Sequence, residues 1–101
     1  MKQVSTAVND KEIAEKIARK LVEAHAAASV HIQEIKSVFE WKGEIKEITE
    51  WTINALCEDI DTARRIIREI HPYELPAFVV SDVNADDETR AWCRHWCDID
   101  S

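Results

Sequence analysis

The chain has 101 residues, and its 13 Lys and Arg against 20 Asp and Glu give a formal net charge of −7. Hydrophobic residues make up 46% and charged residues 33%, a balance that predicts one globular domain over residues 1–101 and excludes a disordered chain. The acidic charge disfavours nucleic acid as a partner, and no apolar run is long enough for a membrane span. Because the N-terminus lacks the apolar core of a signal peptide, we expect a cytoplasmic protein.

The N-terminal segment predicts a strand followed by an amphipathic helix. Residues Gln3–Val8 alternate apolar and polar side chains, as a half-buried strand does. Asn9 stands where a helix N-cap belongs, and Glu12 lies three residues further on, as in a capping box. Apolar side chains then recur at helical spacing to about His25. This helix should therefore pack one face on a sheet.

The middle of the chain predicts a long β-hairpin. Segments Ser29–Trp41 and Glu44–Cys57 are rich in β-branched and aromatic residues, and the Lys42-Gly43 turn between them holds the only Gly. A Gly in this position is typical of a tight hairpin turn. The apolar alternation changes phase within the first strand, which predicts a bulge or bend near Gln33–Glu34.

The predicted strands are longer than the helix that would cover them. Thirteen or fourteen strand residues span about 45 Å, whereas a sixteen-residue helix spans about 24 Å. In a monomer, Phe39, Trp41 and Ile45 at the far end of the hairpin would be left in water. Because exposed apolar strands usually find a partner, this difference in length predicts an oligomer.

The C-terminal half predicts a helix, a strand and a terminal helix. Asp59 or Asp61 caps the first of these helices, which ends at His71 because the next residue is Pro. The strand covers Ala77–Val83, and Asp86 with the Asp that follows it begins the final helix. The order predicts the α+β class with a ferredoxin-like βαββαβ fold, which has a four-stranded antiparallel sheet, both helices on one face, a long central hairpin and a C-terminal helix.

Two segments resemble a known family. Residues 70–76, Ile-His-Pro-Tyr-Glu-Leu-Pro, resemble the His-Pro-Tyr-Glu-x-Pro signature of the CutA (divalent-cation tolerance) family. Residues 36–43, Lys-Ser-Val-Phe-Glu-Trp-Lys-Gly, are similar to its hairpin motif. The resemblance implies a ferredoxin-like fold, a PII-like homotrimer built through the long hairpins, and tolerance to copper and other divalent metals.

The chain departs from the family pattern around the expected cleft between subunits. Ser29 stands where relatives usually have Cys, and His31 stands where they have Asn. Gln33-Glu34 replace a Pro-Gly pair, and Leu56 replaces a Lys. Any ligand site that the family builds from these positions would differ in this chain.

His71 and Glu74 are the candidate metal ligands. An imidazole and a carboxylate together suit Cu(II) or another divalent metal. The remaining donors would come from an adjacent subunit, and no organic cofactor is evident. In the alternative interpretation the segment is a rigid turn, in which Tyr73 packs and His71 caps the preceding helix.

A second hypothesis is a PII-like module that binds a small molecule or a partner protein in clefts between subunits. The residues that the family resemblance assigns to such a cleft are Tyr73, His31, Ser29 and Trp41. The sequence also allows that His31 is a packed core or interface residue. The four Trp are expected in the core and at interfaces, because the acidic charge argues against stacking on nucleic acid bases.

The three Cys are too few for a disulfide framework, so reduced thiols are expected. Cys93 and Cys97 lie four residues apart, on one face of the last predicted helix. We expect both to be packed in the core beside Trp92 and Trp96, with capture of a soft metal by the pair as the alternative. Cys57 is also expected to pack. No signature of catalysis is present, so we expect that the protein is not an enzyme. Together with the family resemblance, this implies a trimeric copper-tolerance protein.

Overall fold

The computed structural model describes residues 1–97 as a four-stranded antiparallel sheet with three helices. Along the chain, its elements are β1 (Lys2–Val8), α1 (Lys11–Glu23), β2 (Ala27–Trp41), β3 (Glu44–Cys57), α2 (Ile60–Ile70), β4 (Val79–Asp82) and α3 (Asp87–Cys97). The strands lie in the order β2-β3-β1-β4. This order is that of a split βαβ fold, so the predicted ferredoxin-like α+β class is confirmed.

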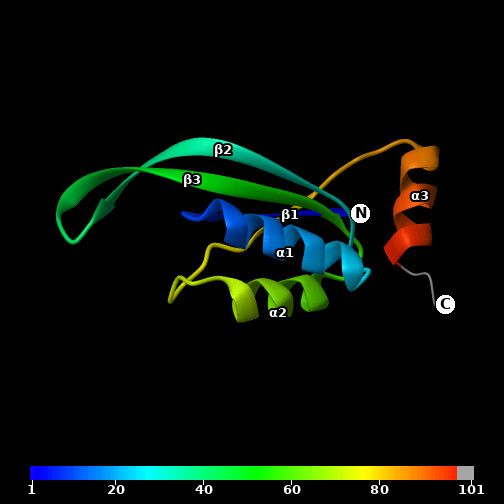
Figure 1. Ribbon diagram of the computed structural model, residues 1–101. Coiled ribbons are helices and arrows are strands. Elements are labelled where there is room, and N and C mark those ends of the chain that lie inside the picture. Colours follow the sequence, from blue (N-terminus) through cyan, green and yellow to red (C-terminus); the bar gives the residue numbers. More distant parts are fainter. Residues whose placement is uncertain (98–101) are drawn as a thin grey trace.

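The core lies between the sheet and the two helices α1 and α2, which pack side by side on one face (Figure 1). The apolar stripe of α1 is buried against alternate residues of β1 and β3, because side chains one strand position apart point to opposite faces. The buried residues are Val4, Val8, Ala14, Ile17, Leu21, Ala26, Ala27, Ile53, Ala55, Cys57, Ala63, Ile66 and Ile67.

An aspartate side chain caps the N-terminus of each of the three helices. The Ile13 backbone N–H donates to Asp10 Oδ1 at 3.1 Å, so the N-cap of α1 is Asp10, and the prediction of Asn9 was wrong by one residue. The carboxylate of Asp10 sits where it accepts the free N–H groups of the first turn. Asp59 caps α2 and accepts from Thr62 N–H at 3.1 Å. Asp86 does the same for α3, accepting from Thr89 N–H at 2.8 Å.

The β2–β3 hairpin pairs without interruption from Ser29 to Trp41. The predicted bulge near Gln33–Glu34 is wrong, because the one irregularity of this ladder lies between Ala27 and Ser29. The apolar residues of β2 change from even to odd positions because apolar side chains lie on both faces of one regular strand. Val30 packs under the helices, while the residues on the odd-numbered positions face the other side.

The hairpin extends far beyond α1 and α2 (Figure 1), and the molecule measures 48 × 25 × 19 Å. Apolar side chains near its tip are exposed, including Trp41 at 60% and Ile45 at 71%. The predicted overshoot of the hairpin is therefore confirmed.

The last strand is shorter than the predicted Ala77–Val83. Only Val79–Asp82 pair with β1, and they do so opposite Lys2–Ser5. Lys2 and Asp82 form an ion pair at this edge. The chain then crosses to α3, which lies beyond the end of the sheet and packs mainly on β2 (Figure 1). None of the helices in residues 1–97 has the length and apolarity needed to cross a membrane.

Candidate functional site

His71 anchors the turn that follows α2. Its backbone N–H donates to Ile67 O at 2.8 Å, and its ring is buried with 6% exposure. Nε2 lies 2.7 Å from Ala7 O, and Nδ1 accepts the Tyr73 backbone N–H at 3.2 Å. This pairing requires the neutral tautomer with its proton on Nε2. Both ring nitrogens are therefore used within the chain, as the interpretation of a rigid turn requires.

Tyr73 ties the same turn to the central strand β3. Its hydroxyl donates to Glu50 Oε2 at 2.7 Å, and its ring meets the His71 ring edge-on at 4.5 Å between centroids. Glu50 is itself buried, with 8% exposure. Burial raises the pKa of the Tyr73 hydroxyl well above its usual range, and the hydrogen bond and the charge of Glu50 raise it further. Tyr73 is thus a fixed hydrogen-bond donor.

Beyond Tyr73, the turn faces the tip of the hairpin across a cavity of about 600 Å³. Trp41, Tyr73, Glu74 and Leu75 line it. Leu75 is 89% exposed, and Glu74 is exposed too. The volume is in the range of small-molecule sites. The structure thus brings together two of the predicted cleft residues, Tyr73 and Trp41, with the predicted metal ligand Glu74.

The other two predicted cleft residues do not join this cavity within one chain. Ser29 and His31 pair with Leu56 and Asn54 near the opposite end of the hairpin. Ten residues of strand separate His31 from Trp41, which is about 33 Å. His31 is exposed, so the interpretation as a packed core residue is wrong for the single chain.

Metal ligands do not gather in the part of the chain that the structure describes. Within residues 1–97, no three His, Cys, Asp or Glu side chains lie close enough to hold one metal ion. His71 and Glu74 are three residues apart, but His71 faces inward while Glu74 lies at the surface. A full divalent site would need donors from outside this chain.

The cysteines lie away from this turn, on β3 and α3. Cys57 and Cys93 are each only 1% exposed, which confirms the prediction that they pack, and Cys97 is half-buried. Burial, followed by the charge of Cys97, raises the pKa of the Cys57 thiol to about 12. Trp92 and Trp96 are 46% and 44% exposed, so neither belongs to the core of the single chain, and the expectation that such Trp lie at interfaces stays a prediction. Their helix packs on the sheet through one narrow face.

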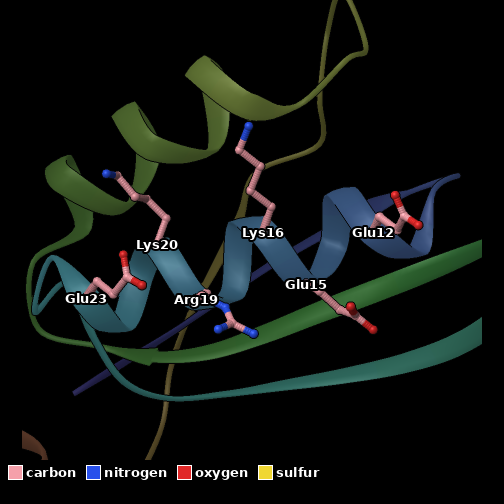
Figure 2. A pocket seen from close by; sticks show the side chains of 6 residues that line it. All are labelled: Glu12, Glu15, Lys16, Arg19, Lys20 and Glu23. Carbon is pink, nitrogen blue, oxygen red and sulfur yellow. The ribbon is translucent and has the colours of Figure 1, made fainter.

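A shallow hollow over α1 is not a binding site. Figure 2 shows that all its lining side chains come from this one helix, with Lys16 and Lys20 pointing toward α2. Charged side chains of both signs fill it, which is typical of a solvated helix face.

Sequence reasoning missed Glu50 and the Ala7 carbonyl as partners of the turn. A backbone carbonyl cannot be recognised from the sequence as a hydrogen-bond partner. Glu50 could have been recognised, because it is a carboxylate between Ile48 and Trp51 in an apolar strand. A buried carboxylate needs a hydrogen-bond donor, and this need points to a residue such as Tyr73.

The sheet order, the two helices on one face and the overlong hairpin define a ferredoxin-like protein of the PII-like kind, with the turn after α2 placed beside the hairpin tip. Residues 2–95 match the family model described as "CutA1 divalent ion tolerance protein". The chain therefore belongs to the CutA1 divalent ion tolerance family.

Individual relatives agree with this assignment. Over 88 residues the chain is 34% identical to the divalent-cation tolerance protein CutA of Pyrococcus horikoshii, covering 82% of this chain and 86% of the relative. The structure of the periplasmic divalent cation tolerance protein CutA from Archaeoglobus fulgidus matches with a TM-score of 0.89 at 28% identity, over 96% of this chain and 99% of that one. The apo PII-like protein CutA from Nostoc matches with a TM-score of 0.84 at 36% identity, over 91% and 92%. The chain spans about half the length of the vertebrate relatives it matches.

Proposed function

We propose that the protein contributes to divalent-cation tolerance by binding Cu(II), or another divalent metal, at a site assembled between the subunits of a homotrimer. Membership of the CutA1 family supports the role in tolerance. The observation that carries the proposal is the position of Glu74, an exposed carboxylate that lines the same cavity as the exposed Trp41 of the hairpin tip.

The hairpin tip supports the oligomer. Phe39, Trp41 and Ile45 expose between 40% and 71% of their surfaces, which is unusual for large apolar side chains on adjacent strands. Covering them with a second copy would remove this area from water at about 25 cal/mol per Å². The same contact would bring donors from a neighbouring subunit toward Glu74.

Glu74 is the ligand that a metal can reach, and His71 positions it. A metal could bind His71 only through Nδ1, by displacing the Tyr73 amide, because Nε2 carries the proton donated to Ala7. We therefore assign Glu74 the role of ligand and His71 that of anchor of the turn. The PII-like small-molecule module is not favoured, since the family and the curated relatives carry the name of cation tolerance. The prediction that the protein is not an enzyme stays a prediction.

A titration with Cu(II), followed by native mass spectrometry and calorimetry, tests the assignment. Glu74→Gln should weaken Cu(II) binding at least about tenfold, because losing even an outer partner of a ligand costs about 10–100-fold in affinity. The matched control is Glu69→Gln, which changes an exposed carboxylate on α2 and should leave the affinity unchanged. Equal affinities for the Glu74 variant and the wild type would refute the site.

The variant His71→Ala, in the same titration, distinguishes whether His71 anchors the turn or binds the metal. Since the variant loses two hydrogen bonds, its melting temperature should fall while the Cu(II) affinity of the folded protein stays the same. A tenfold loss of affinity in the folded variant would instead make His71 a ligand. A purified wild-type protein that retains an organic molecule and ignores Cu(II) would favour the small-molecule module.

A further inference from the structure

A second cavity, of about 430 Å³, adjoins the one that Glu74 lines. The two cavities share the side chains of Trp41 and Tyr73. The walls of the second cavity come from the hairpin, from the residue after β1 and from the turn that follows α2. Its volume suits a small organic molecule. The remaining residues that line it are Asn9, Phe39, Lys46, Ile48 and Glu50.

Glu50 places a buried carboxylate in the wall of this cavity. It is only 8% exposed, yet none of the ion pairs within residues 1–97 includes it. The Tyr73 hydroxyl donates to Oε2 at 2.7 Å, and the carboxylate has a further acceptor in Oε1. A hydroxyl carries no charge, and a buried carboxylate without a cation is costly. A cation bound in the cavity would supply the opposite charge.

Lys46 is the basic residue among those that line the cavity, and it is already paired. Its Nζ lies 2.9 Å from Glu44 Oε2. Lys46 and Glu50 are four residues apart on β3, so about 13 Å of strand separates their backbones. Lys46 is therefore committed to Glu44, and Glu50 is left for a ligand.

Three aromatic rings line the same cavity, those of Phe39, Trp41 and Tyr73. Phe39 and Trp41 are alternate residues of β2, so their side chains point to the same face of the sheet. The faces of aromatic rings attract organic cations, and the Trp ring does so most strongly. Trp41 already attracts the ammonium group of Lys42, whose Nζ lies 5.8 Å from the ring centroid. Aromatic walls with one carboxylate suit an organic cation better than a metal ion, which needs several oxygen donors.

We propose that this cavity binds a small organic ammonium ion, whose N–H groups donate to Glu50 while its alkyl part packs against Phe39 and Trp41. The net charge of −7 attracts cations to the chain in general, and the aromatic walls select organic ones. The site lies within one chain, so it depends neither on the trimer nor on the Cu(II) site at Glu74. A second copy that covers the hairpin tip would enclose the bound ion further.

Calorimetry of the full-length protein with n-butylammonium chloride tests the proposal. The wild type should bind one n-butylammonium ion per chain, and its melting temperature should rise with the concentration of this ion. Sodium chloride and n-butanol at the same concentration should not raise the melting temperature, because the first lacks the alkyl chain and the second lacks the charge. A wild type that does not bind n-butylammonium, or that binds n-butanol equally well, would overturn the proposal.

Two variants test the carboxylate and the ring separately. Glu50→Gln removes the charge but keeps an acceptor for the Tyr73 hydroxyl, so it should fold, as circular dichroism can verify. Its affinity for n-butylammonium should be at least about tenfold weaker, because the buried partner of the charge is lost. Phe39→Leu keeps the apolar bulk but removes a ring, so it should weaken binding about threefold.

Glu47→Gln is the matched control. Glu47 is an exposed carboxylate on the same strand, and its odd-numbered position places it on the opposite face of the sheet from Glu50. This variant should bind n-butylammonium as the wild type does. The proposal is overturned if Glu50→Gln keeps the wild-type affinity, or if Glu47→Gln loses as much.

A titration of Glu50→Gln with Cu(II) keeps the two sites apart. Its Cu(II) affinity should match that of the wild type, since Glu74 lines the neighbouring cavity and is unchanged. Loss of Cu(II) binding together with n-butylammonium binding would make Glu50 a metal ligand and overturn the proposal. A wild type that binds n-butylammonium and ignores Cu(II) would support this site and refute only the one at Glu74.

Discussion

The two ends of the β2–β3 hairpin differ sharply, although the same two strands form both. At the base, Ile53 of β3 is 1% exposed under the helices, whereas near the tip Ile45 of the same strand is 71% exposed. The residue type and the strand are the same, so the difference in exposure comes from the helices, which pack on the base and not on the tip. The base is part of the buried core, and the tip is an exposed apolar surface on which a second copy can pack.

The largest expected effect comes from the matched pair Ile53→Ala and Ile45→Ala. Ile53→Ala should lower the free energy of unfolding by about 2–5 kcal/mol, because it leaves a cavity in the core. Ile45→Ala should act through assembly instead, so its stability should lose the dependence on protein concentration that a trimer has, whereas Ile53→Ala should keep it. Urea unfolding at two protein concentrations distinguishes them. Equal losses with the same concentration dependence in both variants would contradict the difference between base and tip.

Tyr73→Phe tests the hydrogen bond between Tyr73 and Glu50, which lies where the buried base of the hairpin meets the exposed tip. Glu50 is the last buried residue of β3 before the tip. The variant leaves the Glu50 carboxylate without the hydroxyl that donates to it at 2.7 Å. An unsatisfied buried group costs about 1–3 kcal/mol. The double variant with Glu50→Met should lose less than the sum of the two single changes. Strict additivity in thermal unfolding would show that the pair is not coupled.

The smallest effect is a pH dependence confined to the base. Hydrogen bonds from Thr62 lower the pKa of Asp59, the N-cap of α2. Because the folded pKa is lower than the unfolded one, the stabilisation is present above about pH 3.9 and is lost as the pH falls through the folded value.

Asp59→Ala should therefore cost about 0.5–2 kcal/mol at neutral pH. The difference from the wild type should disappear on acidification, and the oligomeric state at neutral pH should not change. Asp61→Ala is the control, since Asp61 is exposed in the same turn and pairs with Arg64 at 3.3 Å. A loss for Asp59→Ala that persisted in acid would argue against the cap.

Much of the fold could be predicted from the sequence, because hydrophobic periodicity and turn residues act locally. The long hairpin and its exposed tip followed from strand length alone, and the Pro after His71 marked the end of α2. The predicted bulge failed since a strand that is apolar on both faces mimics a change of register. Asn9 was preferred to Asp10 because either residue can cap a helix.

The site could be predicted only in part. The sequence singled out His71, Tyr73 and Glu74, but it could not show that His71 points inward to the Ala7 carbonyl. It also could not bring His25 to the Trp96 carbonyl, because that contact depends on how α3 crosses the end of the sheet. Such contacts between distant segments are set by packing rather than by local pattern.

Sedimentation velocity of the wild type and of Trp41→Ser is the most direct test that the hairpin tip is an interface. The account predicts that the wild type sediments with three times the 11.6 kDa mass of one chain, and that Trp41→Ser shifts the protein toward monomer. A wild type that stays at 11.6 kDa at all concentrations would contradict it.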